Sequence, residues 1–332
     1  MSSREQRLSW SHGSFAVLPT AGMLAWAEFL VDGRSFRPFA RAPWMGSLSD
    51  PAIAGHLREL GGEFVCVPFG SSPPPAGMSA EWAKAVGRHE NVMPHGPAAD
   101  RDWEIVSCDG AEARMRLAYD DASPVRMLER TISGRDGEPA LDFRLDIHAR
   151  RAARTSLGLH PIFRLPEAPG ALALDAAFAT GFTYPGLIPP GKTVALPGRT
   201  FASLAGVPGP AGPVDLTHLP PGGEVEDVVQ IGGVSGPVVL AYRDEGFAAV
   251  LDWDRSLLPS TLLWISDRGA TDAPFEGRYR GLGVEPVAAA FDLADEASLA
   301  DNPVNATGIA TAIALSPDRP VSIRYSISAR PL

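Results

Sequence analysis

Two residues that can exchange protons near neutral pH stand in short, mostly apolar segments of this chain. His160 lies within Leu157–Leu165, and Glu285 lies within Gly283–Pro286. An imidazole and a carboxylate that face each other across a cleft form an acid and a base that can work together near pH 7. The pair therefore indicates proton-transfer chemistry, provided that the fold brings the two segments together.

The composition is typical of a folded protein that works on a small ligand. Of the 332 residues, 45% are hydrophobic and 20% are charged, which are ordinary globular proportions. The formal net charge of −10 opposes binding to nucleic acid or to an anionic membrane surface. No segment has the length and apolar character of a membrane span, and the N-terminus lacks the apolar core of a signal peptide. We expect a cytoplasmic protein without nucleic-acid or membrane partners; the sequence carries no signal for an oligomeric state.

Metal and cofactor sites are not indicated by the sequence. Cys66 and Cys108 are too far apart for a CxxC zinc site, and we expect two free thiols. His89 and His95 do not have a recognised zinc spacing, and no glycine-rich phosphate loop is present. We therefore expect no cofactor and no metal.

Short alternating segments between glycines and prolines predict an all-β fold. Apolar residues occupy every second position in Leu141–Ala149, which gives a strand one apolar face. Val125–Ser133 leads into this strand through Gly134–Gly137, which predicts a hairpin. Leu187–Gly223 is rich in Pro, Gly and Thr and predicts long connections and edge strands. Further strands are expected at 113–119, 238–242, 247–253 and 321–327.

Two short helices are expected in the first third of the chain. Asp50 is placed to cap a helix over Pro51–Leu60, and Ser79 is placed to cap a helix over Ala80–Val86. Neither is long enough to organise a domain. We therefore predict one domain, residues 1–332, built from two large packed antiparallel sheets with a few short helices.

Four separated segments resemble motifs of the aldose 1-epimerase (mutarotase) family, and they come in the order found in that family. They are Met93–Gly96, Leu159–Leu165, Val225–Val229 and Gly283–Pro286. The resemblance implies a β-supersandwich and an enzyme that interconverts the α and β anomers of a small-molecule sugar. It also implies that neither a cofactor nor a covalent intermediate is needed.

The resemblance assigns roles to five residues. Glu285 would take the proton of the anomeric O1 hydroxyl, and His160 would donate a proton to the ring oxygen. His95 would be a second donor near the ring oxygen, and Glu226 or Asp227 would hold sugar hydroxyls. An ordinary carboxyl pKa of about 4.3 leads us to expect an ionised Glu285, and nearby carboxylates would keep His160 protonated.

Structural explanations compete with some of these assignments. His95 lies in a segment rich in Pro and Gly, where a histidine is often a surface residue. Glu285 precedes a proline on a predicted strand, where an edge glutamate that faces water is the ordinary explanation. The acidic cluster that contains Glu224, Glu226 and Asp227 also fits a solvated turn. The choice between Glu226 and Asp227 is open at this stage.

The segments that depart from the family pattern concern sugar binding. Gly61–Pro68 lacks the arginine that many mutarotases carry in an early segment, and no tryptophan follows Pro286. Trp44, Trp82 and Trp264 are candidates for a platform that stacks on the apolar face of a sugar.

Three alternative functions use the same residues differently. A hexose-6-phosphate 1-epimerase would need an arginine cluster at the site, for which Arg88, Arg101, Arg164 and Arg278 are the candidates. A non-catalytic carbohydrate-binding protein could use the same fold. Glycoside cleavage by two carboxyls, Glu276 and Glu285, ranks last.

Overall fold

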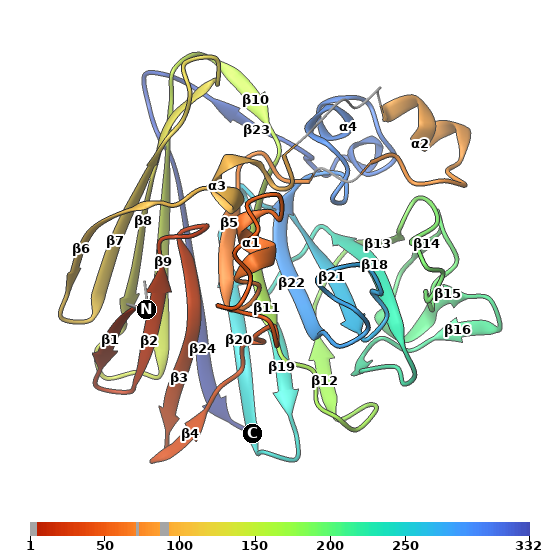
Figure 1. The fold of residues 1–332 in the computed structure, drawn as a ribbon. Helices are drawn as coiled ribbons and strands as arrows, with labels where there is room; N and C mark the ends of the chain where they lie inside the picture. Colours follow the sequence, from red (N-terminus) through yellow and green to blue (C-terminus); the bar gives the residue numbers. More distant parts are fainter. Residues whose placement is uncertain (1–4, 71–72, 87–92) are drawn as a thin grey trace.

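Two large antiparallel sheets dominate the computed structural model, which describes residues 5–70, 73–86 and 93–332 (Figure 1). In spatial order, the first sheet contains β1 (Gln6–Trp10), β2 (Gly13–Leu18), β3 (Met23–Val31), β5 (Glu63–Cys66), β11 (Leu157–Phe163), β22 (Arg280–Ala288), β21 (Ser260–Asp267), β18 (Val225–Gly232), β13 (Thr180–Thr183) and β14 (Thr200–Phe201), with β4 (Arg34–Phe36) paired to β3. The second sheet contains β17 (His218–Leu219), β12 (Leu172–Asp175), β19 (Val238–Tyr242), β20 (Phe247–Trp253), β24 (Val321–Pro331), β9 (Ala140–Ala149), β8 (Val125–Gly134), β7 (Glu112–Ala118) and β6 (Glu104–Asp109).

The remaining elements are short. Two small ribbons pair β10 (Ala153–Thr155) with β23 (Ile313–Leu315) and β15 (Val207–Gly209) with β16 (Gly212–Val214). The helices are α1 (Gly55–Arg58), α2 (Ala80–Ala85), α3 (Gly96–Asp100) and α4 (Asp295–Leu299), with 3-10 turns at Leu204–Gly206 and Asn305–Thr307. The predicted all-β class with a few short helices is confirmed.

The predicted strands agree closely with the structure, whereas one predicted helix is wrong. The hairpin of β8 and β9 and the strands β7, β19, β20 and β24 all form where alternation placed them. Ser79 caps α2 through its hydroxyl, which accepts from the Trp82 N–H. The helix expected over Pro51–Leu60 is confined to α1, because the Asp50 carboxylate accepts from the Ala52 N–H and closes a local turn instead.

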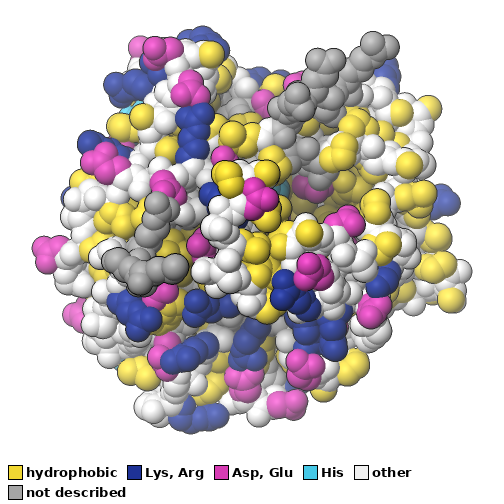
Figure 2. Space-filling model, in the orientation of Figure 1, with side chains coloured by type: hydrophobic (Ala, Val, Ile, Leu, Met, Phe, Trp, Pro, Cys, Tyr) yellow, Lys and Arg dark blue, Asp and Glu magenta, His cyan; other side chains and the backbone are white. Residues whose placement is uncertain are grey.

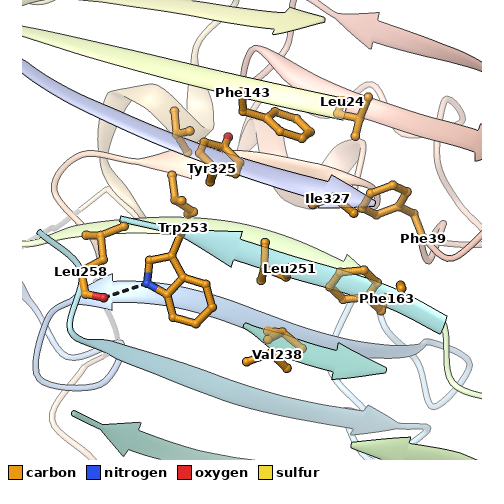
Figure 3. Close-up of a cluster of buried hydrophobic side chains, with 14 of the residues drawn as sticks. Leu24, Phe39, Phe143, Phe163, Val238, Leu251, Trp253, Leu258, Tyr325 and Ile327 are labelled. Atoms are coloured by element: carbon orange, nitrogen blue, oxygen red, sulfur yellow. Dashed lines mark hydrogen bonds between the residues drawn. The ribbon is translucent and has the colours of Figure 1, made fainter. Parts of the chain in front are cut away.

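The first sheet is covered on both faces, which explains why its central strands are buried along their whole length. Side chains from both sheets form one hydrophobic cluster between them, part of which is drawn in Figure 3. A second cluster packs the opposite face of the first sheet against the short helices, through residues such as Phe64, Trp82 and Ile162. Every residue of β11 is therefore buried, including His160. The shared cluster is what a single domain over residues 1–332 requires, although that boundary remains a prediction.

A buried ion pair joins the two sheets beneath the central strands. The Arg130 guanidinium on β8 donates to the Glu63 carboxylate on β5, and both side chains have no exposed surface. Tyr325 on β24 donates its hydroxyl to Glu63 Oε1 at 2.8 Å, and a second Arg130 nitrogen donates to the Gly22 carbonyl. Removing one partner would leave a buried charge without its counter-charge.

We predict that Arg130→Met lowers the free energy of unfolding by about 3–5 kcal/mol, the usual cost of breaking a buried ion pair. Urea unfolding measures the change. Arg116→Met is the matched control, because Arg116 pairs with Glu104 at the surface, where water screens the interaction. Equal destabilisation by the two variants would contradict a structural role for the buried pair.

Candidate active site

A cavity of about 850 Å³ lies over the central strands of the first sheet. Its floor comes from β11, β22, β21 and β18, and its mouth comes from the segments at 73–76 and 187–191. In Figure 2, hydrophobic side chains border a hollow in which a histidine and acidic side chains are visible. Four of the five predicted site residues, His95, His160, Glu226 and Glu285, line this cavity, and Asp227 does not.

The strand register places His160 and Glu285 side by side. β11 pairs with β22 so that Gly158 faces Val287 and Ile162 faces Gly283, which sets His160 opposite Glu285. Both side chains point away from the core between the sheets, because their neighbours along each strand point into it. Nε2 of His160 lies 3.4 Å from Oε1 of Glu285, and the two side chains are 6% and 4% exposed.

Gly283 makes room for the carboxylate. A Cβ atom at this position would stand 2.2 Å from Oε1 of Glu285, which no real side chain permits. The glycine two residues before Glu285 on the same face of β22 therefore lets the carboxyl group lie against the sheet and toward His160. This contact gives a physical reason for the Gly-x-Glu-Pro pattern seen in the sequence.

His95 is held beside the pair by an unusual backbone conformation. It adopts φ +56° as the residue that precedes α3, and Gly96 follows with φ +70°. Left-handed geometry is uncommon for histidine and clusters at functional sites. The Gly70 N–H donates to Nδ1 of His95 at 3.3 Å, so a neutral ring carries its proton on Nε2 and can donate from there.

A third histidine that the sequence did not single out lines the same cavity. His56 on α1 is 4% exposed, and its ring centroid lies 5.3 Å from that of His95. Phe64 on β5 stacks on His160 with centroids 4.4 Å apart. His56 belongs to no motif, and the helix predicted around it was wrongly bounded, so no pattern in the sequence marked it. Phe64 stands in the segment where many mutarotases carry an arginine.

Burial disfavours charge on both members of the pair. It raises the pKa of Glu285 well above its ordinary value, and the nearby Asp292 raises it further. Burial also lowers the pKa of His160 well below its ordinary value, with a further contribution from His95. The expected ionised glutamate and protonated histidine are therefore not the forms that these surroundings favour. A protonated Glu285 beside a neutral His160 fits them better.

The alternation of β18 distinguishes Glu226 from Asp227. Glu226 lines the cavity and accepts hydrogen bonds from Trp264 Nε1 at 2.6 Å and from the Ser266 hydroxyl at 2.7 Å. Asp227 points to the other face and accepts from three backbone N–H groups, those of Val194, Ala195 and Val228. Burial raises the pKa of Glu226 to about 7 and that of Asp227 to about 6. Neither side chain is the solvated turn residue that the acidic cluster allowed.

Of the three tryptophans considered as a platform, Trp264 alone lines the described part of the cavity. Its ring lies edge-on to His160, with centroids 6.0 Å apart, and stacks on Tyr279. Trp44 and Trp82 are buried in the second hydrophobic cluster, at 1% and 5% exposure.

The described residues that line the cavity include no arginine or lysine. Arg101 pairs with Asp120, Arg164 pairs with Glu245, and Arg278 pairs with Glu276, all away from the cavity. Arg88 and His89 lie outside the described residues. The carboxyl group of Glu276, proposed with Glu285 for glycoside cleavage, is exposed and does not line the cavity.

Both cysteines lie within the described residues. Cys66 is buried and Cys108 is exposed, and both are free thiols as predicted. Among the described residues, no helix is long and apolar enough to cross a membrane. Within the same ranges, no three His, Cys, Asp or Glu side chains are arranged to hold a metal ion.

Solved structures match the chain over almost its whole length. A candidate aldose 1-epimerase from Escherichia coli K12 matches with a TM-score of 0.65 at 16% identity, covering 99% of each chain. A galactose mutarotase-like protein from Lactobacillus casei ATCC 334 gives 0.62 at 13% identity, covering 98% of this chain and 100% of that one. An aldose epimerase homologue from C. elegans gives 0.64 at 9% identity, covering 99% of each.

No family model matches the sequence, and no curated protein matches it. At identities of 9–16%, the structural similarity concerns the fold, since one fold can carry many activities. The two packed sheets, their antiparallel order and the full-length matches agree with one another. The chain therefore has the galactose mutarotase-like β-supersandwich fold that its motifs predict.

Proposed function

We propose that the protein is an aldose 1-epimerase that interconverts the α and β anomers of an uncharged aldose. One observation carries the proposal: His160 and Glu285 stand opposite each other on adjacent strands at the floor of a cavity, with Nε2 and Oε1 3.4 Å apart. Buried titratable groups with shifted pKa values that meet in a cavity are typical of active sites.

Ring opening needs one proton removed and one supplied. Glu285, as the carboxylate, takes the proton of the O1 hydroxyl while the C1–O1 bond gains double-bond character. The C1–O5 bond breaks, and O5 takes the bonding electron pair together with a proton from His160. The products are the open-chain aldehyde, a protonated Glu285 and a neutral His160, so protons and charge balance.

Closure on the other face of the aldehyde gives the second anomer. After rotation about C1–C2, O5 attacks C1 and returns its proton to His160, while Glu285 protonates O1. The forms that burial favours, protonated Glu285 and neutral His160, are those that accompany the open-chain sugar. The cyclic sugar must therefore favour the charged pair. A hydrogen bond from its O1 hydroxyl to the Glu285 carboxylate has this effect, because it stabilises the ionised form.

Three further residues fit roles in holding the sugar. His95 presents an Nε2–H donor beside His160, which suits the ring oxygen. Glu226 is oriented by Trp264 and Ser266, and its carboxylate suits a sugar hydroxyl. The Trp264 ring suits the apolar face of a pyranose. Asp227 supports β18 from the opposite face and is assigned no contact with the sugar.

The charge of the cavity favours a sugar without a phosphate. A phosphate dianion is usually bound by arginines, and the described lining has carboxyl groups at Glu226, Glu285 and Asp292 with no arginine or lysine. A binding protein without catalysis would have no use for two buried, opposed proton-transfer groups, whose burial costs stability.

We propose further that the chain works as a single cytoplasmic domain, in keeping with its two free thiols.

We predict that Glu285→Gln reduces kcat/KM for mutarotation by roughly 10²–10⁴-fold, because glutamine keeps the shape but cannot exchange the O1 proton. Polarimetry of freshly dissolved α-glucose and α-galactose measures the rate. Glu276→Gln, the same change at an exposed position outside the cavity, should match the wild type. Acceleration of neither sugar by the wild type would contradict the proposal for these aldoses, and equal rates for the two variants would remove Glu285 from the mechanism.

The neighbouring acids on β18 should respond in opposite ways. Glu226→Gln should raise KM with little effect on unfolding, since the cavity loses a charged acceptor. Asp227→Asn should leave KM near the wild-type value but lower the free energy of unfolding by about 1–3 kcal/mol, because one amide cannot satisfy three backbone donors. Steady-state kinetics and urea unfolding on both variants separate the roles, and a reversed pattern would exchange them.

Glu226 should also give KM a pH dependence. Its pKa of about 7 means that the better acceptor, the carboxylate, forms only as pH rises through neutrality. KM should therefore fall between pH 6 and 8 in the wild type and stay flat over that range in Glu226→Gln. His56 and His95, with pKa values lowered to about 3, stay neutral throughout this range. A fall in KM that persists in the variant would mean that another group titrates.

A further inference from the structure

The mouth of the cavity has an apolar rim formed by two segments that lie far apart in the sequence. Pro73–Ala76 and Leu187–Gly191 both line the cavity, and the Leu187 N–H donates to the Ala76 carbonyl at 2.8 Å. The two segments contain five prolines, one leucine and one isoleucine, and neither contains a charged or hydroxyl-bearing side chain. We call residues 73–76 and 187–191 the apolar rim.

The rim exposes apolar surface at the mouth of the cavity, where the prolines at 73, 74, 189 and 190 are exposed together with Leu187. Leu187 is 57% exposed and is one of five exposed large hydrophobic side chains within residues 5–70, 73–86 and 93–332. Met93, at 38%, is a second member of that set and adjoins Pro94, which also lines the cavity. Exposed apolar surface concentrated at the mouth of a cavity marks a place where a ligand covers it.

Polar and apolar lining are separated by depth. The groups that can hydrogen-bond a sugar ring, His95, His160, Glu226 and Glu285, belong to the floor and its immediate surround. A volume of about 850 Å³ is near the upper end for sites that enclose drug-sized molecules, and it exceeds what one pyranose ring fills. A sugar held by the polar groups therefore leaves the apolar rim uncovered.

We propose that the preferred substrate is an aldose that carries a non-polar substituent on the part of the sugar remote from C1. The inference rests on the proposed epimerase function and specifies its substrate class. The O1 hydroxyl must stay free for ring opening, so the substituent cannot sit on O1. With C1 at the His160–Glu285 pair, the far side of the ring faces the mouth, where an alkyl, acyl or aryl group meets the rim.

The composition of the rim suits this occupant better than a second sugar. A further glycosyl unit would bring hydroxyl groups against prolines and a leucine, which offer no side-chain hydrogen bonds, and desolvating them would oppose binding. An alkyl group gains by leaving water, at about 0.8 kcal/mol for each buried methylene, or roughly fourfold in affinity. Proline rings hold their shape without losing side-chain rotamers, so covering them costs little entropy.

The test compares three free sugars in the same mutarotation assay: glucose, its 6-O-butyl ether and maltose, which carries a larger but polar substituent. We expect kcat/KM for the butyl ether to exceed that for glucose by at least about tenfold, and maltose to gain nothing. Leu187→Asp should abolish the preference, measured as the ratio of kcat/KM for the butyl ether to kcat/KM for glucose. Leu30→Asp, the same change at an exposed leucine that does not line the cavity, should keep the preference.

Binding calorimetry on Glu285→Gln gives a readout that does not need turnover. The butyl ether should bind with a more negative heat-capacity change than glucose, the signature of apolar burial, and Leu187→Asp in the same background should remove the difference. Equal kcat/KM for glucose and its ether, or an equal gain with maltose, would overturn the inference and leave the epimerase proposal standing. Acceleration of none of the three sugars would overturn both.

Discussion

The pairing of β11 with β22 is the constraint on which the candidate site depends. In an antiparallel pair, a slip of one residue turns every side chain to the opposite face. Here the register that sets Gly158 against Val287 brings His160 and Glu285 together at the floor of the cavity and sends Leu159 and Val284 into the core. The same hydrophobic pattern that holds the two sheets together therefore also aligns His160 with Glu285. No loop has to be ordered for these two groups to meet.

Burial of the first sheet on both faces shapes the electrostatics on each side of it. Below the sheet, Glu63 is compensated by Arg130 and Tyr325, so a full charge pair is tolerated. Above the sheet, Glu285 has a histidine as its partner and Asp292 as a neighbour, and burial favours its neutral form. Adjacent residues of β5 lie on opposite sides of the sheet: Glu63 belongs to the buried ion pair below it, and Phe64 stacks on His160 above it.

Strands in which apolar and polar residues alternate could be predicted from the sequence. Features that depend on one particular contact could not. Alternation gave the β8–β9 hairpin and the strands near the C-terminus, and ordered motifs gave His95, His160 and Glu285. The helix predicted over Pro51–Leu60 is wrong, because the Asp50 carboxylate accepts from the Ala52 N–H and closes a local turn where the capping pattern predicted the start of a helix. Once β18 is known to be covered on both faces, the alternation of side chains along the strand places Glu226 and Asp227 on opposite faces of the sheet. His56 and the apolar rim depend on long-range packing, which has no local pattern.

The same burial that makes the site visible also limits how it can work. Burial raises the pKa of Glu285 and lowers the pKa of His160, so these surroundings disfavour charge on both side chains. In the mechanism that we propose, hydrogen bonds that arrive with the sugar create the charged form, and the neutral form returns as the ring opens. Because His95 and Glu226 are already oriented by Gly70, Trp264 and Ser266, those hydrogen bonds can form without rearranging the floor. Under the proposed function, such a site would discriminate between sugars by which of them can complete its hydrogen bonds, and the proposed role of the apolar rim would add a second criterion at the mouth.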